Sequence, residues 1–371
     1  MEVVHLGKYY KPYQGGVEKV NSDLAESCQC FTVKVIAFDE KGSSYESSGG
    51  VEVFRSKVDF SVASAPISIK YLINVLRFSK NNILHVHMPN PFANFSIFLS
   101  FLVGRKGKLI LHWHSDIVKQ KKLYLFYRPL VNWLLDKADI VIATSPIYIE
   151  GSQQLKNHKD KCKVIPIGVD SLLPKVNYER VNKLKKYFNN KKIVFSLGRH
   201  IYYKGFSCLI DAASYISDDA VVVIGGNGEE TQIYHEKITS MGLNDKVYLI
   251  GKIDDEELAS YYYASEVFCL PSIEKSEAFG VVQIEAMSTG TPIVSTNITG
   301  SGVPWVNKDG FSGFVCNPND AKDLADKVNV ILSDDSVREE LSLGARKRYI
   351  SFFTKERMCQ EFDAVYNSFL K

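Results

Sequence analysis

The chain has 371 residues, of which 45% are hydrophobic and 23% are charged, and its formal net charge is +3. A single hydrophobic core rarely serves a chain of this length, so we expect two domains. The net charge is too small to indicate a nucleic acid as partner, and seven scattered cysteines fit reduced thiols in a cytosolic protein better than a disulfide framework.

The sequence shows no sign of export or of a membrane span. Residues MEVVHLGKYY begin directly as a strand, without the basic and apolar regions of a signal peptide. The longest apolar run, residues 92–103, is interrupted by Asn94 and Ser96 and is too short to cross a bilayer. We therefore expect a cytoplasmic protein that is soluble or peripheral to a membrane.

Short apolar runs rich in β-branched residues alternate with amphipathic segments of helix length, which is typical of parallel sheets covered by helices. In the first half we expect strands at residues 3–6, 33–38, 51–54, 83–86, 109–113, 140–143 and 163–165. Helices are expected at 17–26, 67–79, 123–136 and 146–155, the last with Pro146 at its first position.

The pattern lapses after Asp170, where residues 175–192 are polar and basic, and we place a domain boundary near residue 170. It resumes with strands at 192–197, 220–224, 246–250, 267–270 and 292–295, and with helices at 205–216, from 229, and at 321–332, 336–351 and 356–370. The sequence thus predicts an α/β fold of two similar domains. In such sheets, ligands bind where loops leave the carboxyl ends of the strands.

Two motifs of the first half follow expected strands. Gly15 and Gly16 lead from a polar loop into a helix, where glycines allow close approach of a ligand and the helix terminus attracts anions; a tight turn explains them equally well. His112 and His114 alternate in HWHSD and so share one face of their strand. We expect both to point out of the core toward a ligand, although a structural role remains equally open.

Two glycine-bearing turns follow strands of the second half. After the strand 192–197, Gly198 precedes Arg199 and Lys204, whose charges at a helix start suit a diphosphate; solvated surface cations are the alternative. Gly226 lies in GGNG, residues 225–228, which lacks the full spacing of a dinucleotide or phosphate-loop motif. It indicates either close backbone approach to a ligand or a turn alone.

The most informative stretch is SIEKSEAFGVVQIEAMSTGTP, residues 272–292. It places Glu277 and Glu285, with seven residues between them, around an apolar run that is a poor solvated surface. If a helix begins near residues 279–280, the two acids are separated by roughly 12 Å. They could then hold a sugar and a ribose, while backbone amides of Phe279, Gly280, Val281 and Val282 receive phosphates between them.

In this order, Gly15-Gly16, HWHSD, Arg199 with Lys204-Gly205, and SEAFGVVQIEA resemble the retaining glycosyltransferases of family 4. The resemblance spans nearly the whole chain, and the last motif is its most specific part. It implies the GT-B fold, with two Rossmann-like α/β domains facing each other across a cleft. Residues 1–170 would bind the acceptor and 171–371 the nucleotide-sugar donor, with the last helix, from about residue 355, crossing back to the first domain.

The resemblance also implies roles for the matching residues. Arg199 and Lys204 would bind the donor diphosphate and stabilise the leaving group, Glu285 would accept hydrogen bonds from the ribose, and Glu277 would contact the sugar. His114 would line the sugar pocket, with His112 the weaker candidate. Gly15 and Gly16 would allow close approach of donor phosphate and acceptor, while Gly198 and Gly226 remain candidate contacts of the donor from their own turns.

The expected chemistry needs neither a glycosidase-type pair of carboxylates nor a metal ion. No Asp-x-Asp site occurs at a matching position, and the Arg–Lys pair can do the electrostatic work of a divalent ion. In the family the acceptor is thought to attack on the face of the leaving phosphate. We expect no cofactor and no metal requirement.

The segments HVHMPNP and HWHSDIVKQK are similar to bacterial members that add mannose or a related sugar in surface-polysaccharide assembly. The leading hypothesis is transfer of a hexose, mannose from GDP-mannose first, to a polyprenyl-diphosphate-linked glycan of an O-antigen. UDP-linked glucose, galactose or N-acetylglucosamine is the alternative donor. A nucleotide-sugar epimerase, a phosphorylase and a non-catalytic sugar-nucleotide-binding protein also remain open.

A basic stretch precedes an aromatic and aliphatic segment in the first half. Lys119, Lys121 and Lys122 come before LYLFYRPLVNWLL. This pattern predicts an amphipathic helix, which would either rest on the anionic inner face of a membrane or pack on the amino-terminal sheet with solvated lysines.

Overall fold

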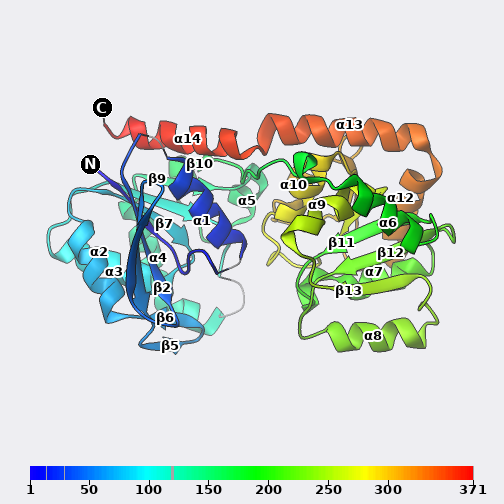
Figure 1. Ribbon diagram of the computed structural model, residues 1–371. Coiled ribbons are helices and arrows are strands. Elements are labelled where there is room, and N and C mark those ends of the chain that lie inside the picture. Colours follow the sequence, from blue (N-terminus) through cyan, green and yellow to red (C-terminus); the bar gives the residue numbers. More distant parts are fainter. Residues whose placement is uncertain (14, 29, 118–120, 371) are drawn as a thin grey trace. The chain divides into compact units, whose positions relative to one another are not determined.

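The computed structural model describes residues 1–13, 15–28, 30–117 and 121–370 (Figure 1). Contacts between residues divide the chain into two compact units. The first contains residues 1–167 together with 355–371, and the second contains residues 168–354. The expected boundary at residue 170 compares with 167/168 in the structure, and the carboxyl-terminal helix belongs to the first unit.

The first unit is built on an eight-stranded sheet in the order β10-β9-β8-β7-β1-β2-β4-β3. Neighbouring strands are parallel except β3 and β4, which pair antiparallel. The strands are β1 Val3–Leu6, β2 Val33–Asp39, β3 Ser44–Ser48, β4 Val51–Lys57, β7 Ile83–Met88, β8 Leu109–Trp113, β9 Ile140–Ala143 and β10 Cys162–Val164. A separate hairpin consists of β5 Phe60–Val62 and β6 Ala65–Ile67.

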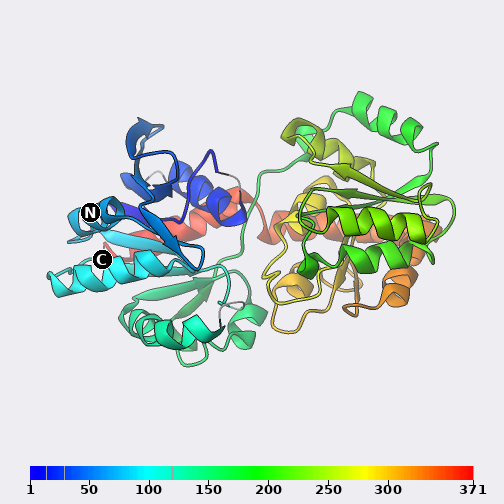
Figure 2. The same ribbon diagram turned by 90° about the horizontal axis from the view of Figure 1, so that it is seen from below.

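Helices cover both faces of this sheet. They are α1 Gly16–Ser27, α2 Ile69–Phe78, α3 Pro91–Leu102, α4 Lys121–Lys137, α5 Pro146–Gly151 and α14 Lys355–Ser368. Helices α2, α3 and α4 pack in sequence against one another, whereas α14 lies alongside α1 (Figures 1 and 2). As predicted, Pro146 occupies the first turn of α5, and the Ser145 side chain accepts a hydrogen bond from the Tyr148 amide.

The second unit is a six-stranded, fully parallel sheet in the order β13-β12-β11-β14-β15-β16. Its strands are β11 Lys192–Leu197, β12 Ala220–Gly225, β13 Val247–Gly251, β14 Val267–Leu270, β15 Ile293–Thr296 and β16 Gly313–Cys316. Its helices are α6 Tyr178–Tyr187, α7 Phe206–Ala213, α8 Thr231–Ser240, α9 Asp255–Ala264, α10 Val281–Thr289, α11 Val303–Val306, α12 Ala321–Ser333 and α13 Asp335–Phe352. The central strands read as continuous apolar runs because both faces of the sheet are covered.

The structure contains a helix that the sequence patterns did not predict, in a segment that is mostly polar but has a narrow apolar stripe. Helix α6 forms within the basic stretch 175–192, because Val181, Leu184 and Phe188 bury one side of it. The apolar run 92–103 forms α3, and the residues expected as helix up to 155 form a helix only to Gly151.

The basic stretch before α4 lies partly outside the described residues, since Lys119 belongs to the segment 118–120. The carboxyl-terminal half of α4 packs on the unit through the buried Val131, Leu134 and Leu135, in agreement with one of the two alternatives for this helix. Its other half exposes Leu125 and Phe126. Of the helices in the described ranges, none is both long and apolar enough to cross a bilayer.

A prediction concerns Gly344, where α13 presses against the backbone of the loop before β16. A Cβ atom at this position would lie 1.7 Å from the carbonyl oxygen of Phe311. We expect Gly344→Ala to lower the free energy of unfolding by roughly 1–3 kcal/mol, as overpacking does, in urea titrations. Gly42→Ala is the control, because no atom lies within 4 Å of the added methyl group; equal stability of the two variants would contradict this packing.

Candidate active site

The predicted residues of the second unit gather at one edge of its parallel sheet. From β11 the chain builds the sheet outward through β12 and β13, and from β14 it builds outward on the other side. The boundary between β11 and β14 is therefore the topological switch point, where loops diverge and leave a crevice for ligands. Arg199 and Lys204 follow β11, and Glu277 follows β14, so they lie on the two loops that flank this point.

Lys204 and Glu277 form an ion pair that joins these loops. The distance from Lys204 Nζ to Glu277 Oε2 is 2.5 Å, and the side chains are 12% and 11% exposed. The Ser272 hydroxyl donates to the same carboxylate oxygen at 3.1 Å, and the Ser301 hydroxyl donates to the backbone carbonyl of Glu277. Because a nearly buried charge is costly without a partner, the pair fixes both side chains in one place.

Gly205 lets the two loops approach so closely. Its φ of 69° is left-handed, and a Cβ atom there would lie 2.0 Å from the carbonyl oxygen of Pro271. A backbone hydrogen bond of 2.8 Å from the Ile273 amide to the Tyr203 carbonyl runs beside this contact. The spacing between Lys204 and Glu277 is therefore set by backbone packing.

Gly226 is also explained by packing between turns, whereas a Cβ atom at Gly198 would lie 3.3 Å from the side chains of Lys204 and Phe206. Gly226 has φ 114°, and a Cβ atom on it would lie 1.9 Å from the carbonyl oxygen of Gly198. At Gly228 a Cβ atom would lie 2.3 Å from the carbonyl oxygen of His200. The turns that follow β11 and β12 thus pack backbone against backbone, which supports the loop that carries Arg199.

Glu285 lies in the second turn of α10, as expected. Its Oε2 accepts a hydrogen bond of 2.9 Å from the hydroxyl of Tyr262, a fully buried residue of α9. The helix begins directly after Gly280, whose φ of 75° is left-handed. The first turn of α10, with Val281 and Val282, therefore presents backbone N–H groups that lack partners within the helix.

Two residues of this edge differ in what they can offer a ligand. Phe279 is 3% exposed and its ring packs near Trp305 and Phe353, so its side chain belongs to the core and only its backbone faces the helix start. Arg199 is exposed, and no carboxylate of the described residues pairs with it. Its guanidinium is thus available to an anion at this edge.

Sequence reasoning missed the partners that orient the two glutamates. Ser272 lies five residues before Glu277 in the same motif, so the motif itself carried a signal for it. Tyr262 lies 23 residues before Glu285 and reaches it only because α9 packs against α10. No local pattern distinguishes Tyr262 from its tyrosine neighbours at 261 and 263.

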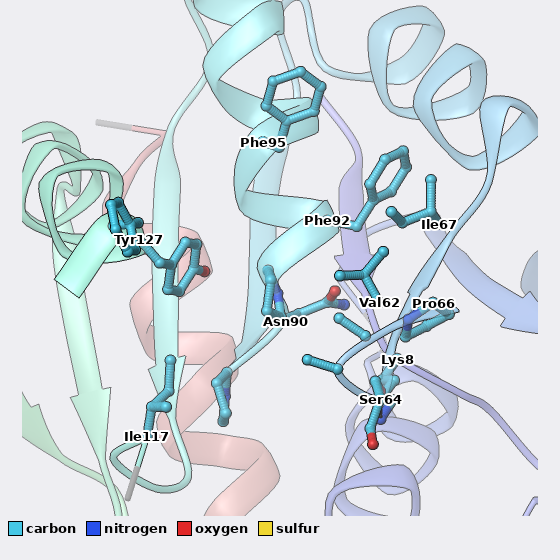
Figure 3. Close-up of a pocket in the computed structure, with 15 residues that line it drawn as sticks. Lys8, Val62, Ser64, Pro66, Ile67, Asn90, Phe92, Phe95, Ile117 and Tyr127 are labelled. Carbon is cyan, nitrogen blue, oxygen red and sulfur yellow. Dashed lines mark hydrogen bonds between the residues drawn. The ribbon is translucent and has the colours of Figure 1, made fainter. Parts of the chain in front are cut away.

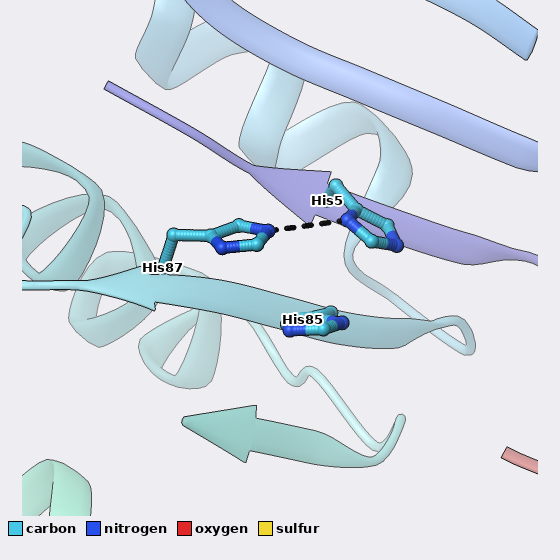
Figure 4. A group of neighbouring side chains, drawn as sticks. All are labelled: His5, His85 and His87. Atoms are coloured by element: carbon cyan, nitrogen blue, oxygen red, sulfur yellow. Dashed lines mark hydrogen bonds between the residues drawn. The ribbon is translucent and has the colours of Figure 1, made fainter. Parts of the chain in front are cut away.

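In the first unit, the two predicted histidines belong to a larger cluster. His5 is opposite His85 in the β1–β7 pair, and His87 is opposite His112 in the β7–β8 pair. Two-residue spacing along β7 and β8 brings all the imidazoles to one face of the sheet, and Figure 4 shows three of them. The buried cluster consists of His5, His85, His87, His112 and His114.

The expectation that both histidines point out of the core is wrong for His112, which is 1% exposed: the ring of Phe362 on α14 lies 4.9 Å from its own. His114 follows the end of β8 and is 6% exposed. The carboxyl-terminal helix, more than 240 residues away in sequence, buries the face of β8 that the strand pattern alone could not show to be covered.

One half of the cluster is joined by Tyr366 of α14. Its hydroxyl oxygen lies 2.6 Å from His85 Nδ1 and 3.3 Å from His5 Nε2. On its other side, His85 Nε2 lies 3.1 Å from His112 Nδ1. The remaining nitrogen of His112, Nε2, is buried and has no hydrogen-bond partner among the described residues.

The other half runs from His5 toward His114. His5 Nδ1 lies 3.0 Å from the amide oxygen of Asn21 on α1 and 3.3 Å from His87 Nε2. His87 Nδ1 then lies 3.0 Å from His114 Nε2. These four residues and the three that the other half adds, His85, His112 and Tyr366, form one continuous hydrogen-bonded chain, which we call the histidine network.

The network determines where its protons are. Because the Asn21 oxygen only accepts, His5 donates from Nδ1, and its Nε2 accepts from the Tyr366 hydroxyl. Tyr366 in turn accepts from His85 Nδ1, whose Nε2 accepts from His112. Toward the other end, His87 Nε2 accepts from His5 Nδ1, and His87 Nδ1 donates to His114 Nε2. When each neutral imidazole carries its proton on Nδ1, every contact joins a donor to an acceptor, and the single His5 proton is shared between Asn21 Oδ1 and His87 Nε2.

Burial keeps these imidazoles neutral. It lowers the pKa of His5 to about 4 and that of His114 to about 3. The pKa values of His85, His87 and His112 also lie well below the usual range, first through burial and then through repulsion from neighbouring imidazoles in their charged forms. The network is therefore uncharged at neutral pH.

Two histidine triads have the spacing of metal ligands, namely His5-His85-His87 and His87-His112-His114. A metal ion needs a lone pair from each ligand. In the network the Nε2 lone pairs of His5, His85, His87 and His114 already accept hydrogen bonds, which leaves only that of His112. The donor set thus fits a hydrogen-bonded network better than a metal site.

Gly15 and Gly16 lie at the start of α1, the helix that carries Asn21 into this network. Gly15 caps the helix with an extended φ of 175°, and Gly16 is its first residue. Both are exposed, and a Cβ atom at Gly16 would meet no atom within 4 Å. Neither glycine is required by packing.

A prediction follows for the pH dependence of stability. The unfolded chain binds protons at these histidines below pH 6.5, whereas the folded chain does not until the pH approaches about 4 at His5. The free energy of unfolding is therefore highest above pH 6.5. As the pH falls from 6.5 toward the folded-state pKa, it decreases by about 1.4 kcal/mol per pH unit for each such histidine. Urea unfolding between pH 7.5 and 4.5 measures this slope.

His112→Asn tests the network specifically, because the Asn side chain keeps a donor near the Nδ1 position but removes the titrating group. We expect little change at pH 7.5 and a slope lower by about 1.4 kcal/mol per pH unit. The exposed His235→Asn is the control for loss of an imidazole outside the network. An unchanged slope in His112→Asn would contradict the assignment of a neutral, buried His112.

Comparison with known proteins agrees with this architecture in both units. Residues 14–171 match the family described as Glycosyltransferase Family 4, and residues 179–348 match Glycosyl transferases group 1. The O-antigen chain mannosyltransferase C of Escherichia coli is 30% identical over 376 residues, covering 100% of this chain and 99% of that protein. The D-rhamnosyltransferase WbpZ of Pseudomonas aeruginosa is 28% identical, covering 95% and 92%.

Among solved structures, sucrose-phosphate synthase from Thermosynechococcus elongatus superposes with a TM-score of 0.81 at 20% identity, covering 100% of this chain and 99% of that one. A match at this identity shows the fold, which is GT-B, as the sequence predicted. Together with the full-length relative at 30% identity, it assigns the family. The chain therefore belongs to the glycosyltransferases of family 4.

Proposed function

We propose that this glycosyltransferase moves a hexosyl group, mannose from GDP-mannose in the first instance, from a nucleotide sugar to a polyprenyl-diphosphate-linked glycan in surface-polysaccharide synthesis. The observation that carries the proposal is the Lys204–Glu277 pair at the switch point, beside the exposed Arg199. The names of the two relatives, an O-antigen chain mannosyltransferase and a D-rhamnosyltransferase, support a hexose of this class as the transferred sugar.

In this proposal the second unit binds the donor. Its diphosphate would lie at the start of α10, between the charges of Arg199 and Lys204. Glu285, oriented by Tyr262, would accept hydrogen bonds from the ribose hydroxyls, and Glu277 would accept from a sugar hydroxyl while it holds the Lys204 ammonium group in place. Each interaction uses a side chain whose position a neighbour already fixes.

The proposed reaction is a substitution at the anomeric carbon with retention of configuration. The bond from this carbon to the β-phosphate oxygen breaks, and a bond to the acceptor oxygen forms on the same face. The acceptor proton passes to the leaving diphosphate. Negative charge grows on that diphosphate as the bond breaks, and Arg199 and Lys204 stabilise it, so no metal ion is required.

The first unit would bind the acceptor. His114 ends the histidine network, with Nε2 held by His87 and Nδ1–H directed away from that contact. As a neutral donor it would bind a sugar hydroxyl, and His112 would act on it only through the network. Gly15 and Gly16, which are exposed at the start of α1, would let the acceptor and the phosphates approach this helix.

A donor screen tests the proposed function. GDP-mannose, UDP-glucose, UDP-galactose and UDP-N-acetylglucosamine are incubated with the protein, with and without a lipid-linked glycan, and released nucleotide and modified sugar are measured. We expect the fastest release from GDP-mannose and no conversion of the donor to an epimer. Faster release from a UDP-sugar would move the assignment to that donor, and binding without release would indicate a non-catalytic protein.

Two substitutions test the roles within the donor site. Glu285→Gln keeps an acceptor for Tyr262 but removes the charge, and should weaken donor binding about tenfold in calorimetry. Lys204→Ala should lower kcat by a factor on the order of 100–1,000, because it removes charge stabilisation of the leaving group.

Each variant needs a control. Lys204→Ala leaves a nearly buried carboxylate unpaired, which costs roughly 3–5 kcal/mol in buried pairs, so Lys204→Ala/Glu277→Gln restores stability without restoring the cation. The control for Glu285→Gln is Glu274→Gln, which removes the charge of another acid in the same motif. Wild-type activity in both Glu285→Gln and the double variant would rule out the proposed donor site.

A further inference from the structure

The first unit contains an apolar cavity of about 500 Å³ that the proposed donor chemistry does not use. Figure 3 shows it between the β5–β6 hairpin, the start of α3 and the first described turns of α4. Lys8 follows β1, Asn90 follows β7 and Ile117 follows β8, so the cavity lies at the carboxyl edge of the sheet. The order β8-β7-β1-β2 places its switch point there, where α/β sheets bind ligands.

The hairpin that forms one wall is held in a strained conformation. Its two-residue turn consists of Ala63 and Ser64, with φ of 49° and 66°, where glycine or asparagine is usual. A two-stranded hairpin alone is marginally stable, and this one is tied down by Lys8, whose Nζ donates to the Ser64 carbonyl at 2.9 Å. Strain retained in this way is common at ligand clamps.

Two hydrogen-bond donors, Lys8 and Asn90, line the cavity. Asn90 is 1% exposed; its Oδ1 accepts from the Ala93 amide at 3.3 Å and so caps α3. Its Nδ2 is buried, points into the cavity and has no hydrogen-bond partner among the described residues. The Lys8 ammonium group lies at the exposed hairpin turn, where it binds the Ser64 carbonyl, and none of the fifteen lining residues is acidic. The cavity therefore suits an anion beside Lys8 and Asn90.

The outer end continues as exposed apolar surface. Val62, Phe95 and Phe126 line the cavity and are 52%, 44% and 87% exposed. Exposed aromatic and aliphatic side chains at the mouth of an apolar cavity indicate a ligand that extends beyond it. The combination of the donors Lys8 and Asn90, apolar walls and an apolar mouth fits an anionic group attached to a long hydrocarbon chain.

We propose that this cavity binds the isoprenoid chain of the lipid-linked acceptor next to its diphosphate, with Lys8 and Asn90 at the phosphate and the hairpin, α3 and Phe126 around the first isoprene units. This proposal rests on the proposed function, because it takes the acceptor to be a polyprenyl diphosphate. It adds a lipid site, so that the enzyme would recognise its acceptor by the lipid as well as by the glycan.

Binding of farnesyl diphosphate to the full-length chain tests the site without any sugar donor. We expect Phe126→Ser to raise its Kd about tenfold or more, as loss of a large apolar contact does, and the neighbouring Leu125→Ser, exposed but outside the cavity, to leave Kd unchanged. Asn90→Asp keeps the helix cap but replaces the inward donor by a charge, and should raise Kd for farnesyl diphosphate more than for farnesol.

Ligand controls separate the sources of binding. Inorganic diphosphate that binds as tightly as farnesyl diphosphate would overturn the proposal, because the apolar walls would then contribute nothing. Decyl phosphate that binds as tightly would also overturn it, because the cavity would then accept any alkyl phosphate and not select an isoprenoid diphosphate. Equal Kd values for Phe126→Ser, Leu125→Ser and the wild type would place the ligand elsewhere.

Transfer assays distinguish failure of this proposal from failure of the proposed function. With a lipid-linked acceptor, Phe126→Ser should raise KM about tenfold with kcat nearly unchanged, whereas KM for the same glycan on a short water-soluble aglycone should not change. Equal effects on both acceptors would overturn the lipid site while transfer itself is intact. If the wild type transfers no sugar but binds farnesyl diphosphate through Phe126, the proposed function fails and the lipid site stands.

Discussion

The ion pair between Lys204 and Glu277 is the constraint around which the second unit's site is arranged. It joins the loop after β11 to the loop after β14 across the switch point of the sheet, with both side chains nearly buried. A charge in this position is tolerated only with its partner, so the pair defines the separation of the two loops. Gly205 allows that separation, because any side chain there would collide with the backbone of Pro271.

In the first unit the buried histidines are uncharged, in contrast to the ion pair of the second unit. They form an uncharged network of imidazoles, in which Tyr366 and Asn21 set the direction of every hydrogen bond. The carboxyl-terminal helix supplies Tyr366 and therefore belongs to the core of the unit in which the chain begins. A neutral network can be buried at low cost as long as each donor finds an acceptor, and acid removes that condition.

The two sheet edges differ in chemistry as they differ in electrostatics. The edge of the second unit combines fixed charges, carboxylates and a helix start, which suits a nucleotide diphosphate and its hydroxyls. The edge of the first unit combines an apolar cavity with the donors Lys8 and Asn90, which suits an amphiphile. The proposed function assigns a water-soluble donor to the second unit and a lipid-linked acceptor to the first. The difference in chemistry between the two sheet edges is consistent with that assignment.

Local sequence determined the parts of this protein whose signal is local. Apolar runs specified the parallel strands, the proline after Ser145 specified a helix start, and the motif 272–292 placed Glu277 before α10 and Glu285 in its second turn. Sequence could not indicate α6, because three apolar side chains define its buried face within a basic stretch.

Only the tertiary structure decided which distant residues meet. Tyr262 reaches Glu285 through the packing of α9 on α10, and Tyr366 reaches His5 and His85 because the last helix returns to the first unit. It also decided that His112 and His114 are buried, since strand alternation tells which residues share a face but not what covers that face. Residue type and periodicity are written locally, whereas burial and hydrogen-bond partners depend on how separate elements pack.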